Sequence, residues 1–347
     1  MNRSDTLHLR IDSARGGQLA LAAEALRAGE LVAFPTETVY GLGANIYDED
    51  ALRAIFDVKG RPHDNPMIVH VSDPEQAAEL ALRIPRYFSE LAEVFWPGPL
   101  TLVILRNASV LDTVTAGLDS VAVRMPGHKI ARALIAEAGV PLAAPSANRS
   151  GRPSPTCAED VFAELGGSIF AVVDGGPCAV GIESTVLDLT RRVPTILRPG
   201  VVTREQLEAV LGTHVAVARS TALRPRSPGQ KYMHYAPETP LVLLLPSENG
   251  TRTRKRLKDA LRSLREEGRT AGLLAPEKFS PFDADAFFSL DAGTPVHYAR
   301  LIYRGLRALD ALALDSILCP GLAEEGIGLA VMNRLRKAAS EILTDEH

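Results

Sequence analysis

The sequence contains little cysteine, few aromatic residues and no excess of positive charge. Its three cysteines, Cys157, Cys178 and Cys319, form no C-x-x-C pair, which argues against a disulfide framework or a thiolate zinc site and favours a reducing compartment. Aromatic residues make up 5% of the chain and the formal net charge is −4. Both values disfavour an extended base-stacking surface and a global polyanion-binding surface, although a local basic groove remains compatible with them.

Long apolar runs are also missing. No uninterrupted apolar segment approaches the length that crosses a membrane, and the N-terminal residues show no apolar core followed by a cleavage site. We therefore expect a soluble, cytoplasmic protein. What the chain does have is 46% hydrophobic residues over 347 positions, which is typical of a well-buried globular protein of about two domains.

Strand-like and helix-like patterns are mixed without strict alternation in the first two thirds of the chain. This mixture predicts an α/β or α+β layer fold with a partly parallel sheet. Periodicity predicts strands at 31–34, 67–71, 100–105, 120–124, 141–145, 169–173, 185–189 and 195–198, and helices at 16–28, 49–58, 74–82, 128–138 and 203–211.

Residues 213–239 change in character, because proline, serine, glycine and arginine dominate and periodicity disappears. We interpret them as a long linker between a first domain, 1–212, and a second domain, 240–347. A loop this long is usually functional or disordered. Beyond it, strands predicted at 240–246, 270–276 and 315–320 alternate with helices at 250–267, 295–312 and 327–342. This alternation predicts a small parallel sheet covered by helices.

The stretch FDVKGRPHDNPMIVHV, residues 56–71, concentrates donors where a helix ends and a strand begins. One interpretation is local: Lys59 interacts with the helix dipole and Gly60 ends the helix. The other is that Lys59, Arg61 and Asn65 converge on phosphates, which guanidinium and ammonium groups bind well. Local features alone leave both open.

Three further donor-rich segments follow predicted strands, namely FPTETVYGLG (34–43), APSANRSGRPSPT (144–156) and the pair GIESTV and ILRPG (181–186 and 196–200). Each by itself also fits an ordinary capped turn or a hydrophilic loop. Together with the first stretch they favour a ligand site, because α/β sheets bind ligands at strand ends.

Several familiar catalytic motifs are missing from the sequence. There is no G-x-x-x-x-G-K-[ST], G-x-S-x-G or H-E-x-x-H, there is no G-x-G-x-x-G after the first strand of the second domain, and the histidines lack metal-ligand spacing. We expect no dedicated metal cage. Any ion would be Mg²⁺ that arrives with a nucleotide and is held mostly by phosphate oxygens and water.

Taken together, PTETVYGLG, KGRP-x-x-NP-x-IVH, PSAN-x-SG-x-PSPT and GIESTV…LRPG closely resemble the threonylcarbamoyl-AMP synthase family, also called YrdC-like, over roughly residues 14–212. The linker motif SPGQKYMHYAP and the domain beyond it resemble the long, two-domain form. The resemblance implies an open, twisted α/β sheet with a concave, positively lined cavity, followed by a smaller Rossmann-like parallel α/β domain.

The resemblance also implies a reaction. L-threonine, bicarbonate and ATP, accompanied by Mg²⁺, would give threonylcarbamoyl-AMP and pyrophosphate. A downstream threonylcarbamoyl-transferase complex would then act on tRNA. Neither a membrane nor stable binding of nucleic acid by this chain is required.

Carried over position by position, the resemblance implies Lys59 and Arg61 as the catalytic cations. The linker would fold over the site as a lid, bringing Lys231 to the nucleotide together with two residues of the ATP site. We expect Lys59→Ala to leave the fold intact, because an exposed helix-end lysine contributes under ~1 kcal/mol. The implied ATP site comprises Lys59, Arg61, Asn65, Ser120, Ser146, Asn148, Ser154, Arg198, His234 and Tyr235, and the implied threonine site comprises Thr36, His70, Arg124, Ala144 and Ser184.

Two other functions stay open from the sequence alone. A basic cavity could serve an RNA-binding module, which the negative net charge and scarce aromatic residues disfavour. A carbamoyl transferase that uses carbamoyl phosphate is the other alternative, because related domains occur in such enzymes; the linker and the second domain disfavour it.

Overall fold

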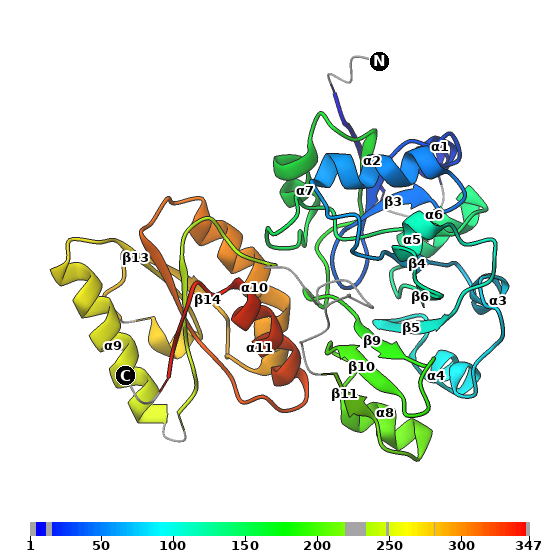
Figure 1. The fold of residues 1–347 in the computed structure, drawn as a ribbon. Coiled ribbons are helices and arrows are strands. Elements are labelled where there is room, and N and C mark those ends of the chain that lie inside the picture. The colour runs from blue at the N-terminus through cyan, green and yellow to red at the C-terminus, as the bar shows by residue number, and fades with distance from the viewer. Residues whose placement is uncertain (1–4, 12–15, 219–233, 248–249, 281, 345–347) are drawn as a thin grey trace. The chain divides into compact units, whose positions relative to one another are not determined.

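The chain forms two compact units in a computed structural model that describes residues 5–11, 16–218, 234–247, 250–280 and 282–344. The first unit comprises Met1–Ser150 and Ser154–Tyr232, and the second comprises Gly151–Pro153 and Met233–His347 (Figure 1). The residues of each unit follow from contacts within the structure. The domain limits predicted from the sequence, at 212 and 240, stay a prediction. Within the described residues, no helix has the length and apolar character needed to span a membrane.

The first unit is built around one mixed sheet. Its strands are β1 (Leu7–Arg10), β2 (Val32–Phe34), β3 (Gly41–Asn45), β4 (Ile68–His70), β5 (Leu100–Leu105), β6 (Ser120–Arg124), β7 (Leu142–Ala143), β8 (Ala171–Asp174), β9 (Thr185–Asp188), β10 (Thr195–Arg198) and β11 (Ala216–Val217). Its helices are α1 (Gly17–Arg27), α2 (Glu49–Lys59), α3 (Pro74–Glu79), α4 (Phe88–Phe95), α5 (Asp112–Thr115), α6 (Lys129–Ala138), α7 (Ala158–Leu165) and α8 (Arg204–Leu211).

The described strands of this sheet lie in the order β1-β8-β2-β3-β7-β4-β6-β5-β9-β10-β11. Some neighbours are parallel, such as β4 with β6 and β5 with β9, whereas β5 with β6 and β9 with β10 are antiparallel. The predicted partly parallel sheet is therefore confirmed. The predictions at 100–105, 120–124 and 195–198 match β5, β6 and β10 residue for residue.

The two faces of the central strands have different surroundings. Because side chains alternate along a strand, Val69 and Val123 enter the large apolar core, which also contains Leu52 and Ile55 of α2 and Leu207 of α8. On the opposite face of β4, β5, β6, β9 and β10, the described residues include a small apolar group, and polar residues of the same strands form the candidate site described below. This group consists of Ile68, Val103, Ala122, Val186 and Leu197.

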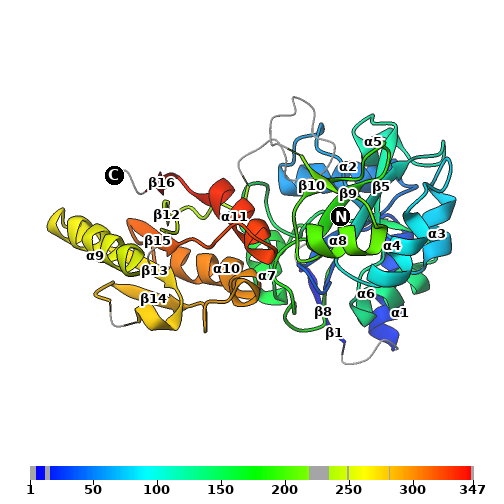
Figure 2. The same ribbon diagram turned by 90° about the horizontal axis from the view of Figure 1, so that it is seen from below.

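The second unit contains a parallel sheet, as predicted. Its elements are β12 (Leu241–Leu244), α9 (Gly250–Glu266), β13 (Ala271–Ala275), the 3-10 helix η1 (Glu277–Phe279), β14 (Ala286–Ser289), α10 (Pro295–Asp310), β15 (Ser316–Pro320), α11 (Ile327–Ala338) and β16 (Glu341–Leu343). The described strands lie in the order β14-β13-β15-β12-β16, with every pair parallel. Figures 1 and 2 show α9 on one face of this sheet and α10 with α11 on the other. This arrangement is the Rossmann-like layering that the sequence predicts.

Candidate active site

The segment after β2 forms a tight turn held by threonine hydroxyls. The Thr36 hydroxyl donates to the carbonyl of Val39 at 2.7 Å and accepts from the amides of Thr38 and Val39 at 3.1 and 3.2 Å. It also lies 2.8 Å from the Thr38 hydroxyl. Both threonines are buried, so this turn presents hydroxyl groups inside the protein.

Arg124, the last residue of β6, reaches this turn with a buried guanidinium. Its Nη1 donates to the Thr38 hydroxyl at 3.0 Å, and its Nε donates to the carbonyl of Gly98 at 3.1 Å. Its Nη2 lies 2.7 Å from Oε1 of Glu37 in an ion pair. The predicted partner of the amino-acid carboxylate is thus fixed on three sides.

His70 lies beside Arg124, because the parallel register of β4 and β6 pairs the two residues. Burial, together with the positive charges of Arg124 and Arg198, lowers the pKa of His70 to about 3, although a backbone hydrogen bond to Ile68 opposes them. The imidazole is therefore neutral at physiological pH. A neutral imidazole beside two guanidinium groups adds no charge to the site and can contact an uncharged part of a ligand.

Ser184, directly before β9, meets Arg198, the last residue of β10. Arg198 donates through Nε to the Ser184 carbonyl at 3.1 Å and through Nη2 to the Ser184 hydroxyl at 3.2 Å. That hydroxyl also lies 2.7 Å from the hydroxyl of Thr101 in β5. All three residues are buried, so a second guanidinium is held in place next to the His70 and Arg124 pair.

Lys59 at the end of α2 is buried, with only 3% of its surface exposed. Its Nζ donates to the Ser146 carbonyl at 2.6 Å and to the Asn148 carbonyl. Burial lowers its pKa well below the usual value, and nearby Arg61 lowers it further. The expectation of an exposed helix-end lysine is wrong, because Nζ points inward and organises the loop that carries Ser146 and Asn148.

Arg61 and Asn65 form the next part of the site. The Arg61 guanidinium donates to the carbonyls of Asn65, at 3.1 Å, and Pro66, at 2.8 Å. Within the described residues, the side-chain oxygen of Asn65 is buried and has no hydrogen-bond partner. A buried polar atom of this kind carries a free-energy cost that a ligand donor would remove.

The loop after β7 joins these parts. The amide of Ala144 donates to the Ile68 carbonyl at 2.9 Å, and Ser146 bridges to Gly41 of β3. At the far end of the loop, the buried Ser154 hydroxyl donates to Oε1 of Glu183 at 2.6 Å. This loop therefore contacts the segments that carry Lys59, His70 and Thr36.

The structure brings thirteen of the fifteen predicted site residues into the first unit, where these contacts link most of them. Ser120 is at the opposite end of β6 from Arg124, where it pairs with Leu105 of β5. His234 and Tyr235 belong to the second unit, where Tyr235 stacks on Tyr303 with ring centres 5.4 Å apart. Their reach to the nucleotide stays a prediction, and Lys231 lies outside the described residues.

Four residues that contact the site were not predicted as members of it: Glu37, Thr38, Thr101 and Glu183. Two signals were available, because Glu37 and Thr38 lie inside PTETVYGLG and Glu183 lies inside GIESTV. Thr101 lies in a strand that reads as apolar core, so only its contact with Ser184 shows that it faces the site.

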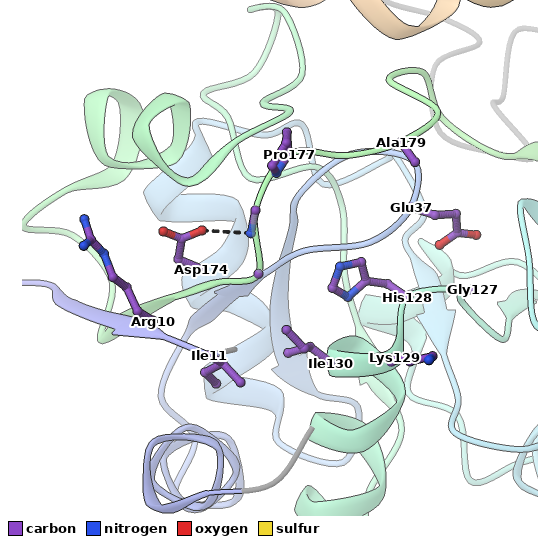
Figure 3. Close-up of a pocket in the computed structure, with 12 residues that line it drawn as sticks. Arg10, Ile11, Glu37, Gly127, His128, Lys129, Ile130, Asp174, Pro177 and Ala179 are labelled. Carbon is purple, nitrogen blue, oxygen red and sulfur yellow. Dashed lines mark hydrogen bonds between the residues drawn. The ribbon is translucent and has the colours of Figure 1, made fainter. Parts of the chain in front are cut away.

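A pocket of about 830 Å³ lies next to this site, and Glu37 belongs to both (Figure 3). Glu37 lines it, but none of the residues predicted from sequence does. It also contains charged groups of both signs, Arg10, Lys129 and Asp174, and the imidazole of His128. The mixture indicates that this pocket is distinct in chemistry from the cationic site.

Comparison with known proteins decides the family. A family model described as telomere recombination matches residues 24–200, and one described as the C-terminal domain of threonylcarbamoyl-AMP synthase matches residues 202–340. This chain belongs to the threonylcarbamoyl-AMP synthase family. The threonylcarbamoyl-AMP synthase of Pyrococcus abyssi is 45% identical over 93% of this chain and 94% of its own length. That of Bacillus subtilis is 46% identical over 93% of both chains.

A solved family structure has the same two-part fold. The crystal structure of Pyrococcus abyssi Sua5 complexed with L-threonine matches with a TM-score of 0.92 and 42% identity, over 98% of this chain and 99% of that one. The two-domain form of the family, predicted from the linker and the second set of strands, is thereby confirmed. The roles of individual site residues remain predictions.

Proposed function

We propose that this protein forms threonylcarbamoyl-AMP and pyrophosphate from L-threonine, bicarbonate and ATP. The observation that carries the proposal is the meeting of Arg124, Arg198, His70 and Ser184 on one face of the sheet, linked through the loop after β7 to Lys59 and Arg61. Such a site suits two anions that must react with each other. Its relatives carry the name of this activity.

The chemistry requires no nucleophile from the protein. The threonine amine attacks bicarbonate, water leaves, and a carbamate forms. A carbamate oxygen then attacks the α-phosphorus of ATP, and the bond to the bridging oxygen of the β-phosphate breaks to release pyrophosphate. Positioning and electrostatic stabilisation are sufficient sources of rate acceleration for such a transfer.

The cations would then have two tasks. Arg124 would bind the threonine carboxylate, with Thr36, His70, Ala144 and Ser184 around the amino acid. Lys59, Arg61 and Arg198 would offset the repulsion between the carbamate and the phosphates. Asn65, Ser120, Ser146, Asn148 and Ser154 would complete the nucleotide site.

We propose Mg²⁺ as part of the nucleotide substrate rather than as a resident ion. In the described residues, no group of three or more His, Cys, Asp or Glu could hold a metal. The side chains of the predicted nucleotide site near Lys59 are cations, amides and hydroxyls. The ion would therefore depend on phosphate oxygens and water. We also propose a cytoplasmic location and a downstream complex that transfers the threonylcarbamoyl group to tRNA.

The test is to incubate the protein with ATP, labelled bicarbonate and each amino acid in turn, and to measure pyrophosphate and labelled adenylate. We expect both products with threonine and bicarbonate together. Pyrophosphate release that ignores the amino acid would contradict the proposal, as would turnover that needs carbamoyl phosphate. An RNA-binding module would instead show steep salt dependence of tRNA binding and no turnover.

A further inference from the structure

The guanidinium of Arg124 is oriented by protein groups on three of its edges. The contacts are the carbonyl of Gly98 at Nε, the hydroxyl of Thr38 at Nη1 and the carboxylate of Glu37 at Nη2. A guanidinium has five N–H donors, one on Nε and two on each terminal nitrogen. Nε and Nη1 each donate one hydrogen bond, whereas the ion pair of Nη2 with Glu37 lacks hydrogen-bond alignment. Among the described residues, one N–H on Nη1 and the N–H groups on Nη2 are therefore left for a ligand. Two such parallel donors match the two oxygens of a carboxylate.

Glu37 supplies the charged contact among these three. Its side chain is 15% exposed and that of Arg124 is 4% exposed, so this ion pair is largely shielded from water. Burial opposes ionisation, but Arg124 and a backbone hydrogen bond from Gly127 outweigh it, so the pKa of Glu37 is lowered. Glu37 is therefore a carboxylate at neutral pH and balances the buried guanidinium charge.

The position of Glu37 is itself fixed by the backbone around it. The carbonyl of Glu37 accepts from the amide of Val180 at 2.8 Å, which ties the turn to the segment before Ser184. On the other side, a Cβ added at Gly127 would lie 3.2 Å from Cδ of Glu37. Figure 3 shows Glu37 at the edge of the pocket, beside the turn at Gly127. Because Gly127 has no side chain, the carboxylate of Glu37 can occupy the adjacent space.

We propose that Glu37 is a positioning residue for amino-acid recognition, which holds the Arg124 guanidinium so that one N–H on each terminal nitrogen faces the substrate α-carboxylate. This inference rests on the proposed function. Glu37 acts through Arg124 and does not contact the reacting atoms. Without its charge, the buried guanidinium would have only neutral partners and could turn away from the substrate position.

The experiment compares Glu37→Gln and Gly127→Ala with the wild-type full chain. Glu37→Gln keeps the shape and removes the charge, whereas Gly127→Ala keeps the charge and displaces the carboxylate. Glu49→Gln is the matched control, because Glu49 lies at the opposite end of α2 from Lys59, where it pairs with Arg53 at 3.1 Å and accepts from the Thr113 hydroxyl at 2.6 Å. For each protein we measure KM for threonine, KM for ATP, kcat and the melting temperature.

We expect KM for threonine to rise by about tenfold or more in Glu37→Gln, and by less in Gly127→Ala, with KM for ATP and kcat within about threefold of wild type. The control should match wild type. An unchanged KM for threonine with a lower melting temperature would mean that Glu37 only stabilises the fold, and equal rises in both KM values would also overturn the inference. If Glu37→Gln does not fold, Gly127→Ala decides the matter alone.

Wild-type behaviour separates this inference from the proposed function. If wild type binds no threonine by calorimetry and forms no labelled adenylate, the proposed function fails and the inference fails with it. If wild type is active and the variants keep its threonine KM, only the inference fails.

Discussion

Buried cations dominate the chemistry of single side chains in this protein. Lys59, Arg124 and Arg198 are all buried, and most of their described contacts are carbonyls and hydroxyls rather than carboxylates. Burying a charge with neutral partners is unfavourable unless further interactions compensate. An anionic substrate supplies that compensation, which is why these positions suit ligand binding better than structural ion pairing.

Lys59→Ala should affect both activity and stability. Removing Nζ takes a donor from the carbonyls of Ser146 and Asn148, and leaving buried carbonyls unpaired costs about 1–3 kcal/mol. We expect turnover to fall by orders of magnitude and the free energy of unfolding to fall by that amount. Steady-state kinetics and urea unfolding measure the two. Full activity of the variant would contradict the proposed role of Lys59 in the reaction. An unchanged free energy of unfolding would contradict its contribution to stability through the carbonyls of Ser146 and Asn148.

His70 should make stability depend on pH. The folded protein keeps His70 neutral because its pKa is lowered to about 3, whereas the unfolded chain titrates near the ordinary value of 6.5. Between these values the unfolded state binds more protons, so stability decreases as pH falls through this window. From pH 7 to pH 5 wild type should lose about 2 kcal/mol more than His70→Gln. Equal losses in denaturant titrations of the two proteins would refute this.

Strands and turns determine which of these side chains meet. The register of β4 with β6 pairs His70 with Arg124, and the antiparallel pairing of β9 with β10 brings Ser184 to Arg198. The LRPG turn after β10 packs very closely on β9, since a Cβ at Gly200 would lie 2.3 Å from the amide nitrogen of Thr185. Only glycine fits there without moving backbone.

Gly200→Ala should therefore separate β9 from the LRPG turn. Because the clash is with backbone, side-chain rotation cannot relieve it, and we expect a loss of about 1–3 kcal/mol in unfolding free energy. KM for ATP should rise as Arg198 moves from Ser184. Gly17→Ala in α1 is the control, because a Cβ there meets no atom within 4 Å. Equal unfolding free energies and equal KM values for ATP in the two variants would contradict the close packing of Gly200 against Thr185.

Sequence patterns located most elements because their apolar periodicity is strong. The predicted bounds of β5, β6 and β10 agree with the structure. The sequence did not predict β3, because its residues, GLGAN, include two glycines and no β-branched residue. The sequence motifs predicted the cationic site residues Lys59, Arg61, Arg124 and Arg198. The motif PTETVYGLG contains Glu37, but the motif does not show its role, because this role depends on an ion pair with Arg124, eighty-seven positions away in sequence.

The first unit carries thirteen of the fifteen predicted site residues, and the second unit carries the other two, His234 and Tyr235. Gly151–Pro153, from the loop between Asn148 and Ser154, belongs to this second unit. There Arg152 pairs with Asp310 at 2.8 Å, and Asp310 also accepts from the amide of Thr239 at 2.8 Å. By their contacts, three residues of the loop between Asn148 and Ser154 thus belong to the second unit.

Cutting the chain after about residue 215 should sharply reduce the yield of threonylcarbamoyl-AMP. Such a chain loses the predicted lid residues His234 and Tyr235, so water would reach the labile mixed anhydride, and it also loses the partners of Arg152. Yield of labelled adenylate is the readout, and circular dichroism of the truncated chain checks that it is folded. Wild-type yield from a folded truncated chain would discard the lid.

A crystal structure with threonine and a non-hydrolysable ATP analogue would show whether both substrates meet in this site. We predict the threonine carboxylate on Arg124 and the phosphates within reach of Lys59, Arg61 and Arg198, with the amino group facing the α-phosphate. A nucleotide bound far from the segments KGRP and PSAN, or a threonine carboxylate away from Arg124, would contradict it.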